Sequence, residues 1–547
     1  MYQIYPRSFK DSNGDGVGDL QGIIQKLDYI KSLGVDVIWL NPIFASPNDD
    51  NGYDVSDYTA IMPEFGTMAD FDQLLKGMHE RGLKLVLDLV ANHSSDEHEW
   101  FKQSRSSRTN PYRDYYHWWN AERGAPPKRW SFFDVDSNAW AYDPKTNAYY
   151  LHYFSRKQPD LNWENPKVRQ EIYKIMRFWL DKGVDGFRMD VIGFISKDDT
   201  FPTLAAENPD EFIAHYAQGP HLPEYLQEMN REVLSRYDAM TVGEGAGVTI
   251  DQALKFVDPA RRELNMMYYF EGINLGYLPG QWGVPDPKGY SLVDFKTLYS
   301  RWNDVFAERG WGTIYLGNHD QPRMVTRWGD DRPQFRELSS KMLTTFLLTM
   351  RATPYYYAGD ELGMTNIRFE HIEDYRDIDS INKYRHLKEQ GGDLKGFLES
   401  QKLTARDNGR TPFQWNAESQ GGFTTGSSWL KVNPNYPVLN AAVQEGDPLS
   451  PLNYFRTLTK LRKAEPALVY GDYALVDKDN PDVYAYTRTL GRDRFLVLLN
   501  FKSHDARANL AGLVPGNSER VAGNYGSPAA HVAELRPYEA AIYRIGH

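Results

Sequence analysis

The sequence predicts an α/β fold, because short β-rich runs alternate with helix-like stretches over about the first 470 of 547 residues. The alternation breaks once, between about 95 and 163, and it gives way after about 470 to short alternating strands. Continuous apolar runs flanked by helices are typical of parallel strands covered on both faces. The repeat therefore favours either an eightfold barrel or a doubly wound sheet.

Seven apolar runs predict strands of this repeating domain. They are YQIYP (2–6), VDVIWL (35–40), KLVLDLV (84–90), GFRMDV (186–191), TVGEG (241–245), GTIYLGNHD (312–320) and TPYYYAGDELG (353–363). The clearest helix precedes the fourth run. Asn165 is suited to cap it, Pro166 suits its first turn, and apolar residues recur at helical spacing until Gly183.

Two segments depart from the repeat. A Trp-, Tyr- and Pro-rich stretch after the third run predicts an inserted, loop-rich domain at 95–165. It separates two parts of the repeating domain, at 1–94 and 166–470. At 471–547 the runs DVYAYTRT, RFLVLLNF and AAIYRIG alternate in the manner of antiparallel strands and predict a β-sandwich domain.

Composition narrows the classes of partner. The net charge of −12 is spread along the chain without a basic patch or an acidic tail. This argues against binding to nucleic acid or to an anionic membrane surface. Zero cysteines exclude disulfides and thiolate chemistry, and no run of about 18 apolar residues occurs. We expect a soluble, cytoplasmic monomer that acts on a small molecule.

Polar side chains stand where the predicted strands end. These are His93, Asp190, Glu244, His319 and Asp320. In a barrel, the carboxyl ends of the strands form the catalytic face. Arg188 and Asp190 are two residues apart and share one face of a strand, where the guanidinium keeps the carboxylate ionised, as a nucleophile requires. The spacing alone is also compatible with a structural ion pair, which is the commoner arrangement.

Four motifs decide between these two interpretations. DLVANH, GFRMDV, TVGEG and LGNHDQP occur in the order and approximate spacing of the α-amylase superfamily, glycoside hydrolase family 13. The chain resembles that family over almost its whole length. QPDLNWENP, RDNGRTPFQW and GDELGMTN resemble its branch of oligo-1,6-glucosidases, dextran glucosidases and sucrose isomerases. The resemblance implies a (β/α)8 TIM barrel with the inserted domain after strand 3, and an enzyme acting on glucosidic bonds.

The resemblance also implies a role for each matching residue. Asp190 is expected as the nucleophile, Glu244 as the acid/base, and Asp320 as the third carboxylate, which holds the sugar hydroxyls. The expected substrate-binding residues are Asp50, Tyr53, His93, Phe154, Gln158, Arg188, His319 and Arg410. A retaining mechanism needs two carboxyl groups roughly 5–5.5 Å apart. Like charges this close favour a proton on one of them, which suits Glu244 as the proton donor.

A segment rich in Asp and Gly follows the first predicted strand. Asp11-Ser-Asn-Gly-Asp-Gly-Val-Gly-Asp19 alternates oxygen ligands with glycines, as a short loop around Ca²⁺ requires. Position twelve is Gly22 rather than a bidentate Glu, which argues against an EF-hand, and a solvated turn is the simpler alternative. The resemblance implies a structural Ca²⁺ site. Its ligands would be Asp11, Asn13, Asp15, Asp19 and the backbone carbonyl of Val17.

Three features bear on the substrate. Val191 follows the expected nucleophile, and Val there accompanies α-1,6 activity in this branch. The segment FEGINLGYLPGQW (270–282) lacks the arginines of the RLDRD-type segment of sucrose isomerases. Gly245 and Ala246 stand where relatives usually carry bulkier residues, which we interpret as a wider leaving-group site.

These features predict a retaining, exo-acting α-glucosidase that prefers α-1,6 bonds at the non-reducing end of short oligosaccharides. A sucrose isomerase or other transglucosylase is the alternative within the same branch. A non-catalytic, amylase-like transporter subunit is a remote alternative, because it would require a membrane anchor or a damaged catalytic set, and the sequence shows neither.

Overall fold

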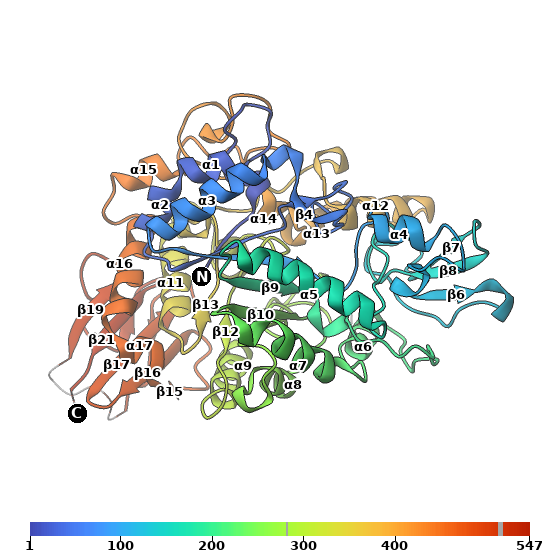
Figure 1. Cartoon of the computed structure of the whole chain (residues 1–547). Helices are drawn as coiled ribbons and strands as arrows, with labels where there is room; N and C mark the ends of the chain where they lie inside the picture. Colours follow the sequence, from blue (N-terminus) through green and yellow to red (C-terminus); the bar gives the residue numbers. More distant parts are fainter. Residues whose placement is uncertain (280–282, 512, 514–517, 547) are drawn as a thin grey trace.

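Parallel strands form a barrel at the centre of the computed structural model, which describes residues 1–279, 283–511, 513 and 518–546 (Figure 1). Seven strands pair in the order β11-β10-β9-β5-β2-β1-β14, and β12 pairs with β13. In chain order they are β1 (Tyr2–Ile4), β2 (Val37–Leu40), β5 (Lys84–Val90), β9 (Gly186–Asp190), β10 (Met240–Gly245), β11 (Met266–Tyr269), β12 (Thr313–Ile314), β13 (Thr353–Pro354) and β14 (Tyr356–Tyr357).

The last barrel strand closes the ring. Its first half, β13, pairs in parallel with β12, and its second half, β14, pairs with β1. Side chains link β11 to β12, because the Thr313 hydroxyl donates to the Met267 carbonyl (2.8 Å). The hydroxyl of Tyr315, just after β12, donates in the same way to the Tyr269 carbonyl (2.9 Å). The predicted eightfold barrel is therefore confirmed over the doubly wound sheet.

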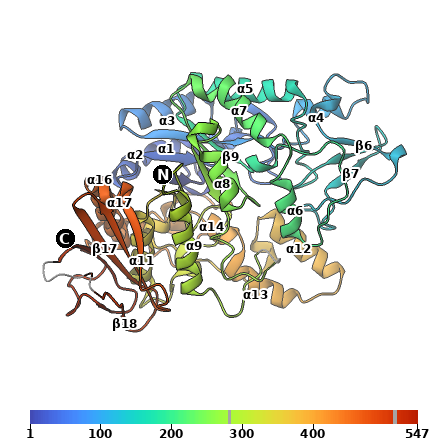
Figure 2. The same ribbon diagram turned by 90° about the horizontal axis from the view of Figure 1, so that it is seen from below.

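Helices cover the outside of the barrel (Figures 1 and 2). The main ones are α1 (Leu20–Gln25), α2 (Leu27–Ser32), α3 (Met68–Glu80), α5 (Pro166–Asp181), α7 (Leu222–Glu232), α8 (Ile250–Val257), α9 (Leu292–Val305), α11 (Arg336–Thr349) and α16 (Pro451–Ala464). Helix α5 has the predicted limits. The Asn165 side chain accepts a hydrogen bond from the Lys167 backbone, and the apolar stripe that includes Ile172 and Trp179 is buried.

The remaining helices lie in the connections. They are α4 (Glu99–Ser104), α6 (Pro209–Tyr216), α10 (Met324–Trp328), α12 (Ile378–Glu389), α13 (Leu394–Thr404), α14 (Asp407–Arg410), α15 (Ala441–Glu445) and α17 (Pro466–Tyr470). Strands β3 (Phe44–Ala45) and β4 (Asp57–Ile61) form a small antiparallel pair after β2.

The inserted segment contains more regular structure than the sequence indicated. Strands β6 (Trp118–Asn120), β7 (Trp140–Asp143) and β8 (Ala148–Leu151) form an antiparallel sheet with β8 in the middle. This sheet projects at the end of the molecule opposite to the C-terminal strands (Figure 1). The segment returns to the barrel where His93 and Asp160 form an isolated β-bridge. The proposed domain limits stay predictions.

The C-terminal strands form two sheets, as predicted for a β-sandwich. Five antiparallel strands pair in the order β15-β16-β17-β21-β19, and two more pair as β18-β20. Their bounds are β15 (Asp472–Val476), β16 (Val483–Leu490), β17 (Asp493–Asn500), β18 (Ala506–Arg507), β19 (Glu519–Gly523), β20 (Glu534–Leu535) and β21 (Ala540–Arg544). Side chains alternate along β16: Val483 and Ala485 pack with Leu535 of the small sheet, whereas Tyr484 and Tyr486 join the main core.

Candidate active site

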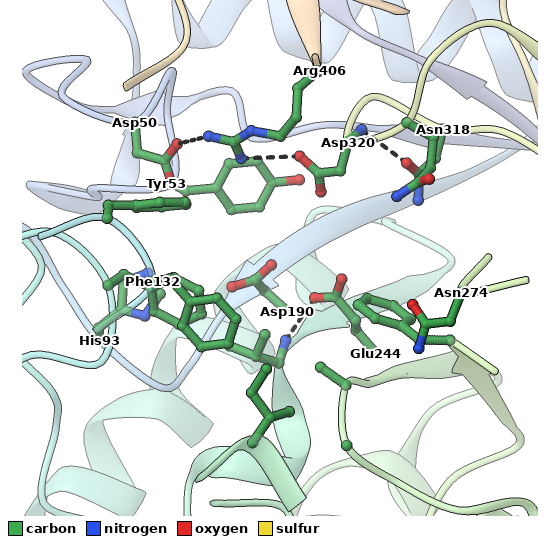
Figure 3. A pocket seen from close by; sticks show the side chains of 18 of the residues that line it. Asp50, Tyr53, His93, Phe132, Asp190, Glu244, Asn274, Asn318, Asp320 and Arg406 are labelled. Carbon is green, nitrogen blue, oxygen red and sulfur yellow. Dashed lines mark hydrogen bonds and ion pairs between the residues drawn. The ribbon is translucent and has the colours of Figure 1, made fainter. Parts of the chain in front are cut away.

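The three predicted catalytic carboxylates meet at the carboxyl ends of the barrel strands, as expected for this fold. Asp190 ends β9, Glu244 lies one residue before the end of β10, and Asp320 lies in the loop after β12. Figure 3 shows Asp190 and Glu244 side by side on one wall of a pocket, with Asp320 on the facing wall. All three line the same cavity of about 250 Å³.

One arginine holds three carboxylates beneath this pocket. Arg188 lies fully buried on β9, with one terminal nitrogen 2.7 Å from Asp190 and 2.9 Å from Asp88. Its other terminal nitrogen lies 2.9 Å from Oε2 of Glu244. Asp88 faces Arg188 across the β5–β9 ladder and was not predicted. A lone Asp within the apolar run KLVLDLV was the signal, because a buried charge requires a partner.

The shared arginine affects the charge of the pair. Burial raises the pKa of Asp190 well above its usual range, the neighbouring Glu244 carboxylate adds to this, and Arg188 opposes it. Burial also raises the pKa of Asp88 to about 6. One guanidinium faces three buried carboxylates, so the repulsion among them opposes the simultaneous ionisation of all three. The expectation that Arg188 keeps Asp190 ionised took account of Glu244 but not of Asp88, which shares the same nitrogen of Arg188.

Glu244 is oriented by the turn after β9. The backbone N–H of Val191 donates to Oε2 of Glu244 (2.9 Å), the same oxygen that Arg188 approaches. Val191 has φ 34° and ψ 42°, a left-handed conformation that β-branched residues rarely adopt. Oε2 thus accepts from the Val191 backbone and is ion-paired with Arg188, whereas Oε1 has no such contact with the described residues.

Arginines also hold the carboxylates on the facing wall. Arg406 donates to Asp320 (3.1 Å) and to Asp50 (3.4 Å) (Figure 3). Arg410 donates to the same oxygen of Asp320 (2.9 Å). Burial acts to raise the pKa of Asp320, but the neighbouring His319 and the two arginines hold it below its usual range. Burial raises the pKa of Asp50 to about 7, against the influence of the same arginines.

Tyr53 and His319 form a buried polar chain between the two walls. Their rings lie parallel, with centroids 5.4 Å apart, and Nε2 of His319 lies 2.7 Å from the Tyr53 hydroxyl. That hydroxyl donates to Asp88 (2.9 Å) and accepts from Asn41 (2.9 Å). Nε2 of His319 also lies 3.1 Å from Asp320. His319 therefore contacts both Tyr53 and Asp320 directly and positions these two side chains.

The inserted segment supplies one side of the pocket. Gln158 donates to Asp50 (3.2 Å), and its side-chain carbonyl accepts from the Ser155 backbone (3.0 Å). The ring of Phe154 lies 5.0 Å from that of His93, measured between centroids. Burial lowers the pKa of His93 to about 3, so that its imidazole is neutral at ordinary pH.

The predicted residues thus divide into lining and supporting groups. Asp50, Tyr53, His93, Phe154, Asp190, Glu244 and Asp320 line the cavity. Gln158, Arg188, His319 and Arg410 contact these residues from behind. Lining residues that the sequence analysis missed include Phe132, Phe133, Asn274, Asn318, Gln321 and Arg406. The last three residues of the segment compared with sucrose isomerases, 280–282, lie outside the described residues.

The predicted calcium loop folds tightly after β1. Asp11 is buried, and its two carboxylate oxygens accept from the backbones of Asn13, Gly14 and Gly16 and from the Thr424 hydroxyl. Asp15 is exposed and accepts from the Val17 backbone. Among the described residues, no three His, Cys, Asp or Glu side chains gather as they would around a metal. A Ca²⁺ ion would therefore rely on Asn13 and on the carbonyl of Val17 as well as on the carboxylates.

Comparisons with known proteins agree with this geometry. The family model "Alpha amylase, catalytic domain" matches residues 3–471. An oligo-1,6-glucosidase of Parageobacillus thermoglucosidasius is 51% identical, over 100% of this chain and 98% of the relative. A trehalose-6-phosphate hydrolase of Bacillus subtilis (strain 168) is 43% identical, over 100% of this chain and 97% of the relative.

Solved structures with the same fold include trehalulose and isomaltulose synthases. A trehalulose synthase variant has a TM-score of 0.95 at 47% identity, covering 100% of this chain and 98% of that one. An isomaltulose synthase from Klebsiella sp. LX3 has a TM-score of 0.95 at 47% identity, covering 99% and 98%. Within the described residues, no helix is long and apolar enough to cross a membrane. With a family model that matches residues 3–471 and relatives similar over their whole length, the chain belongs to the α-amylase family.

Proposed function

We propose that this protein is a retaining, exo-acting α-glucosidase that releases glucose from the non-reducing end of short oligosaccharides, with a preference for α-1,6 bonds. The observation that carries the proposal is the pair Asp190 and Glu244, held by the two terminal nitrogens of Arg188 in one pocket. Two carboxyl groups on either side of the scissile bond are the requirement of a retaining mechanism.

The roles follow from the surroundings of each carboxylate. Asp190 attacks the anomeric carbon and forms a glucosyl ester, while Glu244 protonates the departing oxygen through its free Oε1. Water, activated by Glu244, then cleaves the ester. Asp320 stays ionised beside two arginines, so that it binds sugar hydroxyls and favours the positive charge that develops on the ring.

Exo action is supported by the shape of the pocket. Arg406 joins Asp50 to Asp320 across the facing wall, and Gln158 joins Asp50 to the inserted segment. These contacts close the pocket beyond the site for the terminal sugar. A cavity of about 250 Å³ bounded in this way favours a chain end over the middle of a long glucan.

The linkage preference rests on the relatives and on one side chain. Four of the most similar relatives are oligo-1,6-glucosidases, at 47–51% identity. Val191, immediately after Asp190, lines the pocket with its branched side chain. Its left-handed backbone fixes the direction of that side chain. A bulky apolar group beside the leaving-group site favours the more flexible α-1,6 arrangement.

Sucrose isomerisation is the second candidate, because the solved structures with the same fold include trehalulose and isomaltulose synthases. Both reactions begin with the same glucosyl-enzyme and differ in what attacks it. The absence of arginine from the segment 270–282 of the sequence favours hydrolysis. Ala246 and Gly247 line the pocket and offer little bulk to retain a released sugar beside the glucosyl-enzyme.

Product analysis distinguishes the candidates. The protein is incubated separately with isomaltose, maltose and sucrose, and the products are separated by chromatography. We expect glucose from isomaltose and slower release from maltose. Isomaltulose or trehalulose from sucrose, with little glucose from isomaltose, would contradict the proposal in favour of isomerisation. The variant Glu244→Gln is the control for contaminating activity.

We also propose that the loop of Asp11, Asn13, Asp15, Val17 and Asp19 binds a structural Ca²⁺ ion. The tight fold of this loop and the oxygen-rich character of these five residues support it. Such an ion would stabilise the connection after β1 and take no part in the reaction. The monomeric state and the cytoplasmic location stay predictions, which light scattering and cell fractionation test.

A further inference from the structure

Asp377 is a buried carboxylate that lies behind the wall of the active-site pocket facing the reacting pair. Its Oδ1 accepts from Nε of Arg406 (3.0 Å) and from Nη2 of the same guanidinium. Nη1 of Arg410 lies 4.0 Å from that oxygen and has no hydrogen-bond partner among the described residues. Asp377 therefore stands behind both of the arginines that hold Asp320.

The guanidinium of Arg406 has a partner at each of its three nitrogens. Nε and Nη2 face Asp377, Nη2 also reaches Asp50 (3.4 Å), and Nη1 reaches Asp320 (3.1 Å). The ring of Phe133 covers one face of the group, with its centroid 4.8 Å from Cζ. Because a guanidinium is planar and rigid, holding its Nε edge also fixes the direction of Nη1. Asp377 thus determines where Arg406 meets Asp320.

Two neighbouring segments hold Asp377 in place. Its Oδ2 caps helix α12, where it accepts from the backbone (3.2 Å) and from the hydroxyl (2.9 Å) of Ser380. Its own backbone N–H donates to the carboxylate of Asp407 (2.9 Å), the residue after Arg406. The start of α12 and the start of α14 therefore interlock, because each segment supplies a carboxylate that holds the other.

The charge and the place of Asp377 exclude a direct part in bond cleavage. Burial acts to raise its pKa, but Arg406 and Arg410 lower the pKa to about 2, so that the group is ionised at any ordinary pH and transfers no proton. Asp377 is not among the described residues that line the active-site pocket, whereas Arg406 and Asp320 are. Any effect of Asp377 on the reaction therefore passes through the arginines.

We propose that Asp377 is a positioning residue for the reaction, which orients Arg406 and supports Arg410 so that both arginines hold Asp320 towards the terminal sugar. The proposal rests on the proposed function and extends it to a group that touches no substrate atom. A carboxylate with a structural role alone would cap α12 and leave the action of Asp320 unaffected, so the two roles differ in what they do to catalysis.

A double-mutant cycle separates these two roles. Asp377→Asn removes the charge and keeps a side chain that caps a helix as well as Asp does. We expect it to lower kcat/KM about 30-fold, near the lower end of the cost of breaking a buried charge pair. In the Arg406→Met protein the same change should cause no further loss, because residues that act as a unit are not additive. Asp393→Asn makes the same change at the exposed cap of α13 and should leave kcat/KM unchanged.

The cycle is measured below the melting temperature of every variant, with whichever of isomaltose, maltose and sucrose the unsubstituted protein consumes fastest. An equal loss from Asp377→Asn with and without Arg406 would overturn the proposal and leave Asp377 as a helix cap. An unchanged kcat/KM in Asp377→Asn would overturn it as well. A protein that consumes none of the three sugars contradicts the proposed function instead. The same non-additivity is then expected in the Kd for glucose by calorimetry, and additive losses there would overturn the positioning role.

Discussion

At the scale of single residues, Arg406 governs the charge of the wall that faces the reacting pair. It lowers the pKa of Asp320 and opposes the rise in the pKa of Asp50. Arg406→Met removes this positive charge, so the pKa of Asp320 rises and its ionised form is lost at a higher pH on acidification. We expect kcat/KM to fall about 100-fold, because the half-buried Asp320 and the buried Asp50 each lose a charged partner. A pH profile of kcat/KM should show its acid limb moved to higher pH.

The conservative change Arg406→Lys is the control for that prediction. It keeps the charge and loses the planar fork that reaches both carboxylates. We expect it to restore the acid limb and to leave kcat/KM reduced. An acid limb that stays in place in Arg406→Met would show that Arg406 does not control the ionisation of Asp320.

Asp88 acts on the reacting pair with the opposite sign. Its carboxylate adds to the rise in the pKa of Asp190 and shares Arg188 with it. Asp88→Asn removes the negative charge and keeps an oxygen that accepts from the Tyr53 hydroxyl. The pKa of Asp190 then falls, Asp190 stays ionised to lower pH, and the acid limb of kcat/KM should move to lower pH. A shift to higher pH would contradict this account of the cluster.

The site residues that the sequence predicted differ from those it missed in whether a local motif reveals their contacts. Asp190, Glu244 and Asp320 lie in local motifs that the sequence displays directly. Arg406 lies in the same motif as the predicted Arg410, but its contact with Asp50 joins positions 356 residues apart. Only the fold shows that both arginines reach one oxygen of Asp320.

At the scale of elements, the loop from Asp11 to Asp19 offers a test that does not depend on activity. A ligand at 100 times its Kd stabilises the folded state by about 2.7 kcal/mol. If the loop binds Ca²⁺, removal of the ion with EDTA should lower the melting temperature by a few degrees and leave kcat unchanged in the folded protein. Asp15→Ala should abolish the difference between EDTA and excess Ca²⁺.

Asp28→Ala is the matched control, because it removes another exposed carboxylate outside the loop. It should retain the response to Ca²⁺. Identical melting curves of the unsubstituted protein with EDTA and with Ca²⁺ would show that the loop is held by its own hydrogen bonds. Calcium titration by calorimetry gives the stoichiometry independently.

Sequence patterns predicted the long elements better than the short ones. Helix α5 and strands β5, β9 and β10 were predicted from continuous apolar runs and a capping residue. Strand β11 was missed because four residues, MMYY, do not distinguish a strand from a buried helical segment. The run at 312–320 contains only two residues of β12, because the rest forms the loop that carries Asp320.

At the scale of the whole molecule, the C-terminal domain is joined to the barrel by cations as well as by apolar packing. Lys296 of α9 is fully buried, and its ammonium donates to the carbonyls of Asp477 (3.0 Å), Asn480 (2.7 Å) and Val483 (3.2 Å). Arg488 of β16 is also buried and donates to the carbonyl of Leu468 (2.8 Å). Each barrel–sandwich contact of this kind replaces water around a charge with fixed oxygen atoms.

Lys296→Met tests how much this junction contributes to stability. The change keeps the length of the side chain and removes three charge-assisted hydrogen bonds, leaving three carbonyls to find other donors. Hydrogen bonds to charged groups contribute about 1.5–3 kcal/mol each, and part of this is recovered by water, so we expect a loss of about 3 kcal/mol. The measurement is the melting temperature by calorimetry together with kcat/KM at a temperature where the variant is folded. Lys478→Met is the control, because Lys478 is exposed in the loop whose Asp477 and Asn480 carbonyls accept from Lys296. This variant should melt as the unsubstituted protein does. A Lys296→Met variant that melts with the control would show that apolar packing alone joins the domains. A change in kcat/KM at constant folding would show instead that the sandwich influences the active site through α9.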